Sequence, residues 1–181
     1  MIHAKSYNST KAKNIDELPV KISFVGFPAV GKTTILKLLS ENIVNQFYIP
    51  TMGFDFRSVK IGNKLITVWD FGGQKSFLDM NLSHYLFGSD IIFIVTDSTP
   101  KNVLDSRKLL DISRDNIEDD GVVFVLANKQ DLPGHMDAER VESVLHCKTY
   151  PCTAIDPAER SNLMKFIERE LDIASNIRRK K

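Results

Sequence analysis

Residues 26–34 read Gly-Phe-Pro-Ala-Val-Gly-Lys-Thr-Thr, and their types and spacing suit chemistry on phosphate groups. The segment matches G-x-x-x-x-G-K-[ST], the pattern of a loop that binds a nucleoside triphosphate. The two glycines let the backbone approach the phosphates closely, so that successive N–H groups form an anion-binding nest. The Lys32 ammonium can reach the β- and γ-phosphates, and the Thr33 hydroxyl can ligate Mg²⁺. The predicted phosphate contacts are Gly26, Ala29, Val30, Gly31, Lys32, Thr33 and Thr34.

A second group of candidate residues follows an apolar run and reads Trp69-Asp-Phe-Gly-Gly-Gln74. Asp70 falls at the expected carboxyl end of a strand, where doubly wound sheets bind ligands, and it can hold Mg²⁺ through a water. The Gly73 N–H can contact a γ-phosphate. The Gln74 amide can both donate to and accept from a water, so it suits the positioning of a nucleophile. The alternative is an ordinary strand-end aspartate before a Gly-Gly turn.

A third group, Asn128-Lys-Gln-Asp131, follows another apolar run. The Asp131 carboxylate can accept from two donors of guanine, the ring N1–H and the 2-amino group. Adenine lacks that pair and would leave the carboxylate unmatched, so we expect strong discrimination against adenine. Asn128 would tether the loop, and the stem of Lys129 can lie along the base. The alternative is a polar loop without a ligand, because these residue types are common in loops.

Alternating strand and helix patterns position these groups. Apolar-rich runs predict strands, and two of them are continuously apolar, which is typical of central strands in a parallel sheet. Two others flank Gly62-Asn63 and predict a β-hairpin. The last helix should open at Asp156-Pro157 and bury a stripe formed by Leu163, Phe166, Ile167, Leu171 and Ala174. The predicted strands are 20–25, 54–61, 65–70, 91–95 and 122–126, and further helices are predicted from 33 and over 101–115 and 137–145.

The predicted architecture is a three-layer α/β fold with a mostly parallel sheet and one antiparallel hairpin edge. The chain of 181 residues fits one domain, with a mobile or weakly helical segment at 1–18, a core over 19–175 and a basic tail at 176–181. The net charge of +1 gives no general case for nucleic-acid binding. Two cysteines and the absence of an apolar leader or of 18 uninterrupted apolar residues favour the cytoplasm. The basic tail is either a solvated helix end or a weak contact for an anionic membrane.

Together these motifs resemble the small GTPases, and in detail the Arf family. The resemblance covers about residues 20–172 and includes Pro50-Thr51, Trp69–Gln74 with its doubled glycine, and Asn128–Pro133. It implies that Thr51, which from chemistry alone reads as a turn threonine, is a Mg²⁺ ligand in switch I, and that residues 71–87 are switch II. It also implies that Thr153 and Ala154 belong to a guanine-supporting loop, with the Ala154 N–H on the guanine carbonyl.

The function expected from these residues is a molecular switch that binds GTP or GDP with Mg²⁺. Gln74 and Lys32 are the expected catalytic residues, and turnover without an activator should be on the order of 10⁻³ s⁻¹ or less, because the motifs contain no catalytic arginine. Exchange factors, activating proteins and effectors are the implied partners, through switch I and switch II. The alternative is a GTP-locked scaffold, because Pro28 removes one N–H donor from the loop. Ile2 stands where N-myristoylation needs glycine.

Overall fold

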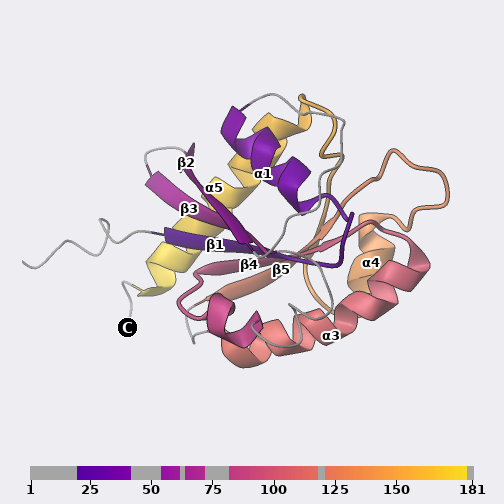
Figure 1. Cartoon of the computed structure of the whole chain (residues 1–181), viewed down its shortest axis with the longest axis horizontal. Helices are drawn as coiled ribbons and strands as arrows, with labels where there is room; N and C mark the ends of the chain where they lie inside the picture. The colour runs from indigo at the N-terminus through magenta and orange to yellow at the C-terminus, as the bar shows by residue number, and fades with distance from the viewer. Residues whose placement is uncertain (1–19, 42–53, 62–63, 72–81, 118–120, 179–181) are drawn as a thin grey trace, which may run out of the picture.

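A sheet with the strand order β2-β3-β1-β4-β5-β6 forms the middle layer of the computed structural model, which describes residues 20–41, 54–61, 64–71, 82–117 and 121–178 (Figure 1). The β2–β3 pair is antiparallel, and the other neighbouring pairs are parallel. The α/β fold class predicted from the sequence is therefore confirmed. The strands are β1 (Val20–Val25), β2 (Phe54–Ile61), β3 (Lys64–Phe71), β4 (Ile91–Thr96), β5 (Val122–Ala127) and β6 (Thr149–Pro151).

Helices cover both faces of this sheet. Figure 1 shows α1 and α5 on one face and α3 and α4 on the other. The helices are α1 (Lys32–Glu41), α3 (Pro100–Asn116), α4 (Ala138–Leu145) and α5 (Glu159–Arg178), and a short helical segment spans residues 82–86. The predicted strands and helices are present, with ends that differ by one or two residues. The predicted turn at 62–63 lies outside the described residues.

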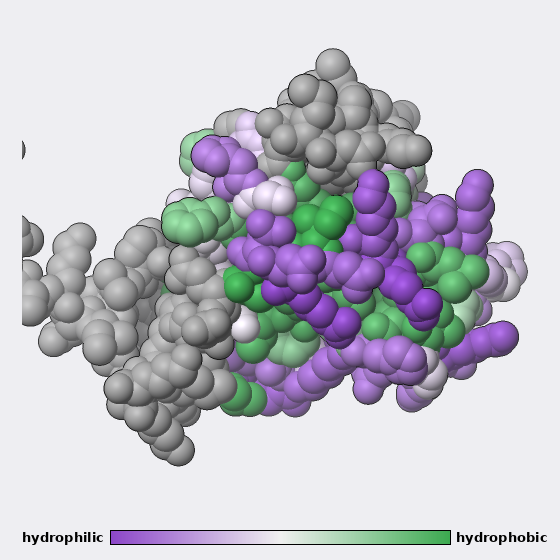
Figure 2. Space-filling model, turned by 90° about the horizontal axis from the view of Figure 1, so that it is seen from below, coloured by the Kyte–Doolittle hydropathy of each residue, from purple (hydrophilic) through white to green (hydrophobic). Residues whose placement is uncertain are grey.

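The continuous apolar run of β4 is explained by its two buried faces. All six of its residues are buried. Phe93 packs in the core cluster that contains helices α1 and α5, whereas Ile92 and Ile94 pack in the cluster under α3 and α4. Successive side chains of a strand point to opposite faces, so a strand covered on both sides must be apolar at every position. Helix α3 exposes several charged side chains, and Figure 2 shows hydrophilic residues mixed with hydrophobic ones on the described part of the face seen from below.

The last helix begins slightly later than predicted. Asp156 accepts the Ala158 N–H through its side chain and the Glu159 N–H through its carbonyl, which makes a turn before α5 starts at Glu159. The helix buries Leu163, Phe166, Ile167 and Leu171, four members of the predicted stripe. It continues to Arg178, so the first residues of the predicted tail are helical. No helix within the described ranges is long and apolar enough to cross a bilayer.

The carboxyl ends of the parallel strands meet at one edge of the sheet, and this edge gathers the candidate residues. Phe24 of β1 pairs in register with Asp70 of β3, and Val25 pairs with Ile94 of β4. The residues after β1, at the end of β3, and after β4 and β5 therefore lie side by side. In doubly wound sheets this edge is where ligands bind.

Candidate functional site

The loop between β1 and α1 has no room for side chains at its two motif glycines. A Cβ on Gly26 would lie 2.4 Å from the carbonyl oxygen of Val95, and a Cβ on Gly31 would lie 2.2 Å from Nδ2 of Asn128. Gly31 also has a φ of 104°, which L side chains rarely adopt. The glycines therefore keep a concave backbone at the start of α1, where N–H groups and the helix dipole favour an anion.

The Lys32 ammonium is held inside this loop. Its Nζ atom donates to the carbonyl oxygens of Gly26 and Phe27, both at 2.9 Å, and the residue is only 6% exposed. Burial lowers the pKa of Lys32 from 10.5 to about 8, and the carboxylate of Asp70 opposes that shift. A partly desolvated cation fixed by the backbone is therefore placed to meet a phosphate.

This pKa predicts that nucleotide affinity falls at alkaline pH. In the unfolded chain Lys32 keeps its proton up to about pH 10.5, so between about pH 8 and pH 10.5 the unfolded state binds more protons than the folded state. The free energy of unfolding of the nucleotide-free protein therefore increases as pH rises through this window. Bound phosphates favour the charged lysine, so binding above about pH 8 requires proton uptake and becomes weaker. Titration calorimetry of GDP binding from about pH 7 to about pH 9.5, in buffers of different ionisation enthalpy, should reveal that proton. A pH-independent affinity without proton uptake would contradict the prediction.

Two oxygen ligands for a cation meet beside this lysine. The Thr33 hydroxyl at the start of α1 donates to Oδ2 of Asp70, which is completely buried at the end of β3. Mg²⁺ prefers hard oxygen ligands and usually takes only one or two from protein, with the rest from waters and substrate phosphates. The described residues contain no cluster of three or more His, Cys, Asp or Glu side chains that could hold a metal by themselves. Thr33 and Asp70 therefore fit a Mg²⁺ ion that shares its coordination with phosphates.

Asn128 joins the phosphate loop to the segment expected to bind the base. The residue is 2% exposed; its Nδ2 donates to the carbonyl of Val30 at 2.8 Å, and its Oδ1 accepts from the Ala154 N–H at 3.0 Å. One side chain thus crosslinks the loops after β1, β5 and β6. This is the tethering that the sequence predicted for Asn128. In the same loop Lys129 is half-buried with a φ of 64°, and Asp131 is exposed.

The hydrogen bond from the Ala154 N–H bears on one sequence-based expectation. The resemblance placed the Ala154 N–H on the guanine carbonyl, but in the structure this single hydrogen is given to Asn128. Ala154 is buried and Thr153 is half-buried, and the segment contacts the loop of residues 128–131, here called the base loop, through the bond from Ala154 to Asn128. The direct contact of the Ala154 N–H with the guanine carbonyl stays a prediction.

Three predicted site residues lie outside the described residues: Thr51, Gly73 and Gln74. Sequence reasoning also missed two residues that hold the base loop in place. Ser98 bonds the loop at Asn128, and Gln130, which is part of the loop, bonds Ser98. Gln130 stands inside the Asn128–Asp131 motif, and Ser98 follows the end of β4, so position at a strand end was the available signal. The structure brings the other predicted residues, from the end of β3 and from the loops after β1, β5 and β6, to one edge of the sheet.

A comparison with protein-family models supports the assignment suggested by this geometry. Residues 7–171 match the model described as the ADP-ribosylation factor family. The match spans most of the chain and includes every element from β1 to the buried part of α5. The chain therefore belongs to the ADP-ribosylation factor family of GTP-binding small GTPases.

Proposed function

We propose that the protein is a guanine-nucleotide-dependent switch that binds GTP and GDP with Mg²⁺ and slowly hydrolyses GTP to GDP. The observation that carries the proposal is the position of Asn128, whose amide bonds the phosphate loop at Val30 and the loop after β6 at Ala154. A nucleotide needs a phosphate site and a base site at a fixed separation. The Asn128 crosslink holds those two sites relative to each other.

Each end of the nucleotide has its own set of residues in this proposal. The backbone N–H groups of the loop and the Lys32 ammonium bind the phosphates, and the Asp131 carboxylate accepts from N1–H and the 2-amino group of guanine. Thr33, Asp70 and Thr51 would hold Mg²⁺, which neutralises charge on the β- and γ-phosphates when it is bound. Lys129 lies along the base. The γ-phosphate orders the segments around Thr51 and Gly73, and its loss releases them, which is the switch.

Hydrolysis is assigned to Gln74, whose amide orients the attacking water in line with the γ-phosphate. Gln74→Leu keeps the size of the side chain and removes both hydrogen-bonding groups. We expect GTP turnover to fall at least about tenfold, because the loss of one preorganised hydrogen-bonding group at a reacting centre costs that much or more, whereas GDP affinity should stay unchanged. Single-turnover phosphate release with GTP-loaded protein measures the first, and fluorescent GDP titration the second. Equal turnover in the variant and the wild type would remove Gln74 from the mechanism.

A GTP-locked scaffold is the second candidate, and Pro28 is the observation that favours it. Pro28 is exposed at the tip of the phosphate loop and has no N–H to direct at a phosphate. If hydrolysis were lost, purified protein kept with Mg²⁺ would still contain GTP after days. Chromatography of the released nucleotide separates the candidates, since the switch yields GDP.

The expected partners act through the parts of the chain that respond to the γ-phosphate. We infer exchange factors, activating proteins and effectors that contact switch I around Thr51 and switch II at residues 71–87. Because intrinsic GTP hydrolysis is slow, an activating protein is needed to return the switch quickly to its GDP-bound state. A cytoplasmic location, with at most a weak peripheral contact of the basic tail with an anionic membrane, completes the proposal.

A further inference from the structure

Ser98, which follows β4, has a backbone conformation that serine rarely adopts. It is completely buried and has a φ of 64°, in the left-handed region that glycine adopts far more readily. Strained backbone of this kind persists only where the surroundings determine it, and it concentrates near functional sites. The contacts of Ser98 show what determines it.

Every polar atom of Ser98 is hydrogen-bonded, and most of the bonds lead to the base loop and the turn after it. Its N–H donates to Thr96 Oγ1 at 3.2 Å, and its carbonyl accepts from the Met136 N–H at 2.8 Å. Its hydroxyl donates to the carbonyl of Asn128 at 2.6 Å and accepts from Nε2 of Gln130 at 2.8 Å. A hydroxyl has one hydrogen, so the direction of these two bonds is fixed. Ser98 therefore holds both the start and the middle of the loop.

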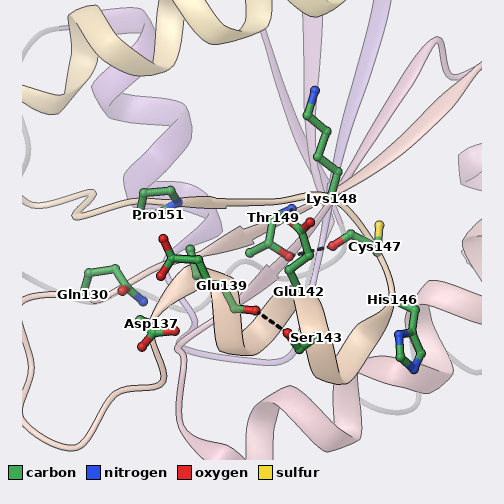
Figure 3. A pocket seen from close by; sticks show the side chains of 11 residues that line it. Gln130, Asp137, Glu139, Glu142, Ser143, His146, Cys147, Lys148, Thr149 and Pro151 are labelled. Carbon is green, nitrogen blue, oxygen red and sulfur yellow. Dashed lines mark hydrogen bonds between the residues drawn. The ribbon is translucent and has the colours of Figure 1, made fainter.

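Gln130 completes the attachment. Its Nε2 donates one hydrogen to Ser98 and the other to the carbonyl of Met136 at 3.0 Å, and its backbone N–H donates to the carbonyl of Cys152 at 3.3 Å. Gln130 also lines one end of an open groove of about 780 Å³ between α4 and β6, where it lies beside Asp137 (Figure 3). Because this side is open, the two amide bonds, rather than packing there, fix the side chain of Gln130.

We propose that Ser98 and Gln130 are positioning residues that set the discrimination for guanine, an inference that rests on the proposed function. Asp131 follows Gln130 directly, so the orientation of its carboxylate depends on how residues 128–130 are held. Two hydrogen bonds to N1–H and the 2-amino group require both carboxylate oxygens to be aligned. A loop released from Ser98 keeps the bond to N1–H by rotating and loses the bond to the 2-amino group.

Inosine diphosphate tests this step because it has N1–H and lacks the 2-amino group. In Gln130→Met, which keeps the shape and removes both donors, we expect GDP to dissociate about tenfold faster and inosine diphosphate less than about threefold faster. Ser98→Ala removes the hydroxyl and should likewise accelerate the release of GDP more than the release of inosine diphosphate. Ser98→Gly also removes it but suits the positive φ, so it keeps the proposal testable if Ser98→Ala fails to fold. Stopped-flow release of each nucleotide in excess Mg²⁺ gives the rates.

Matched controls separate positioning from general destabilisation. Ser106→Ala removes another buried serine hydroxyl, bonded to the carbonyl of Asn102, and Asn116→Leu removes another half-buried amide, bonded to the carbonyl of Ile112. Both lie in α3, so the ratio of the two release rates should match the wild type. A Ser98→Gly variant that behaves as the wild type, or equal acceleration of both nucleotides in Gln130→Met, would overturn the inference alone. A wild-type protein that binds no guanine nucleotide would overturn the proposed function and the inference with it.

Discussion

Gly31→Ala should lose about a hundredfold in affinity for GDP. The new Cβ would stand 2.2 Å from Nδ2 of Asn128 on a backbone with a φ of 104°. The strained backbone costs on the order of 1–3 kcal/mol. Displacing the Asn128 amide leaves a buried polar group unsatisfied, at about 1–3 kcal/mol more. Both penalties apply in the loop that must surround the phosphates, and 1.4 kcal/mol corresponds to about a factor of ten.

The chain provides a matched control in Gly88. Its φ is also positive, at 69°, but a Cβ there would meet no atom within 4 Å. Gly88→Ala therefore adds the backbone strain without the collision with Asn128. Fluorescent GDP titration and thermal unfolding of both variants separate the effects. We expect Gly88→Ala to lower the melting temperature modestly and to bind GDP as the wild type does, and similar GDP affinities in both variants would refute the argument.

Asp131→Asn should exchange guanine preference for xanthine preference. The carboxylate offers acceptors to N1–H and the 2-amino group, whereas an amide offers one acceptor and donors. Xanthine keeps N1–H and carries a 2-oxo group, which pairs with the amide donors. We expect GDP affinity to fall at least about a hundredfold and xanthosine diphosphate to become the tighter ligand, because unmatched buried polar groups give the largest discriminations.

The control for this exchange is Asp137→Asn. Asp137 caps α4 by accepting the Arg140 N–H at 2.7 Å, and asparagine caps a helix about as well. The control therefore makes the same chemical change six residues after Asp131, at a side chain that has no role in the proposed base site. Competition titrations with both diphosphates should leave its guanine preference intact. A guanine preference in Asp131→Asn would show that the base is read elsewhere.

The sequence by itself determined the layer order and the candidate chemistry, because both depend on local pattern. The apolar runs of β4 and β5 predicted central strands, since strands covered on both faces must be apolar throughout. The glycines at 26 and 31 with Lys32 predicted a phosphate loop, since the motif is contiguous in the chain. For the same reason the Asn128–Asp131 motif pointed to guanine before any contact was known.

Only the tertiary structure decided which residues support one another across the chain. Asn128 bonds Val30, 98 residues away, and Thr33 meets Asp70 from a neighbouring strand. The sequence signal for Ser98 was only its position after a strand, which is ordinary for a serine until its φ and its hydrogen bonds to residues 128, 130 and 136 are seen. The hydrogen bond from the Ala154 N–H to Oδ1 of Asn128 joins residues 26 positions apart, and neither motif indicated it. Hydrogen bonds between distant segments depend on how the strands pair and twist, and no local pattern encodes that.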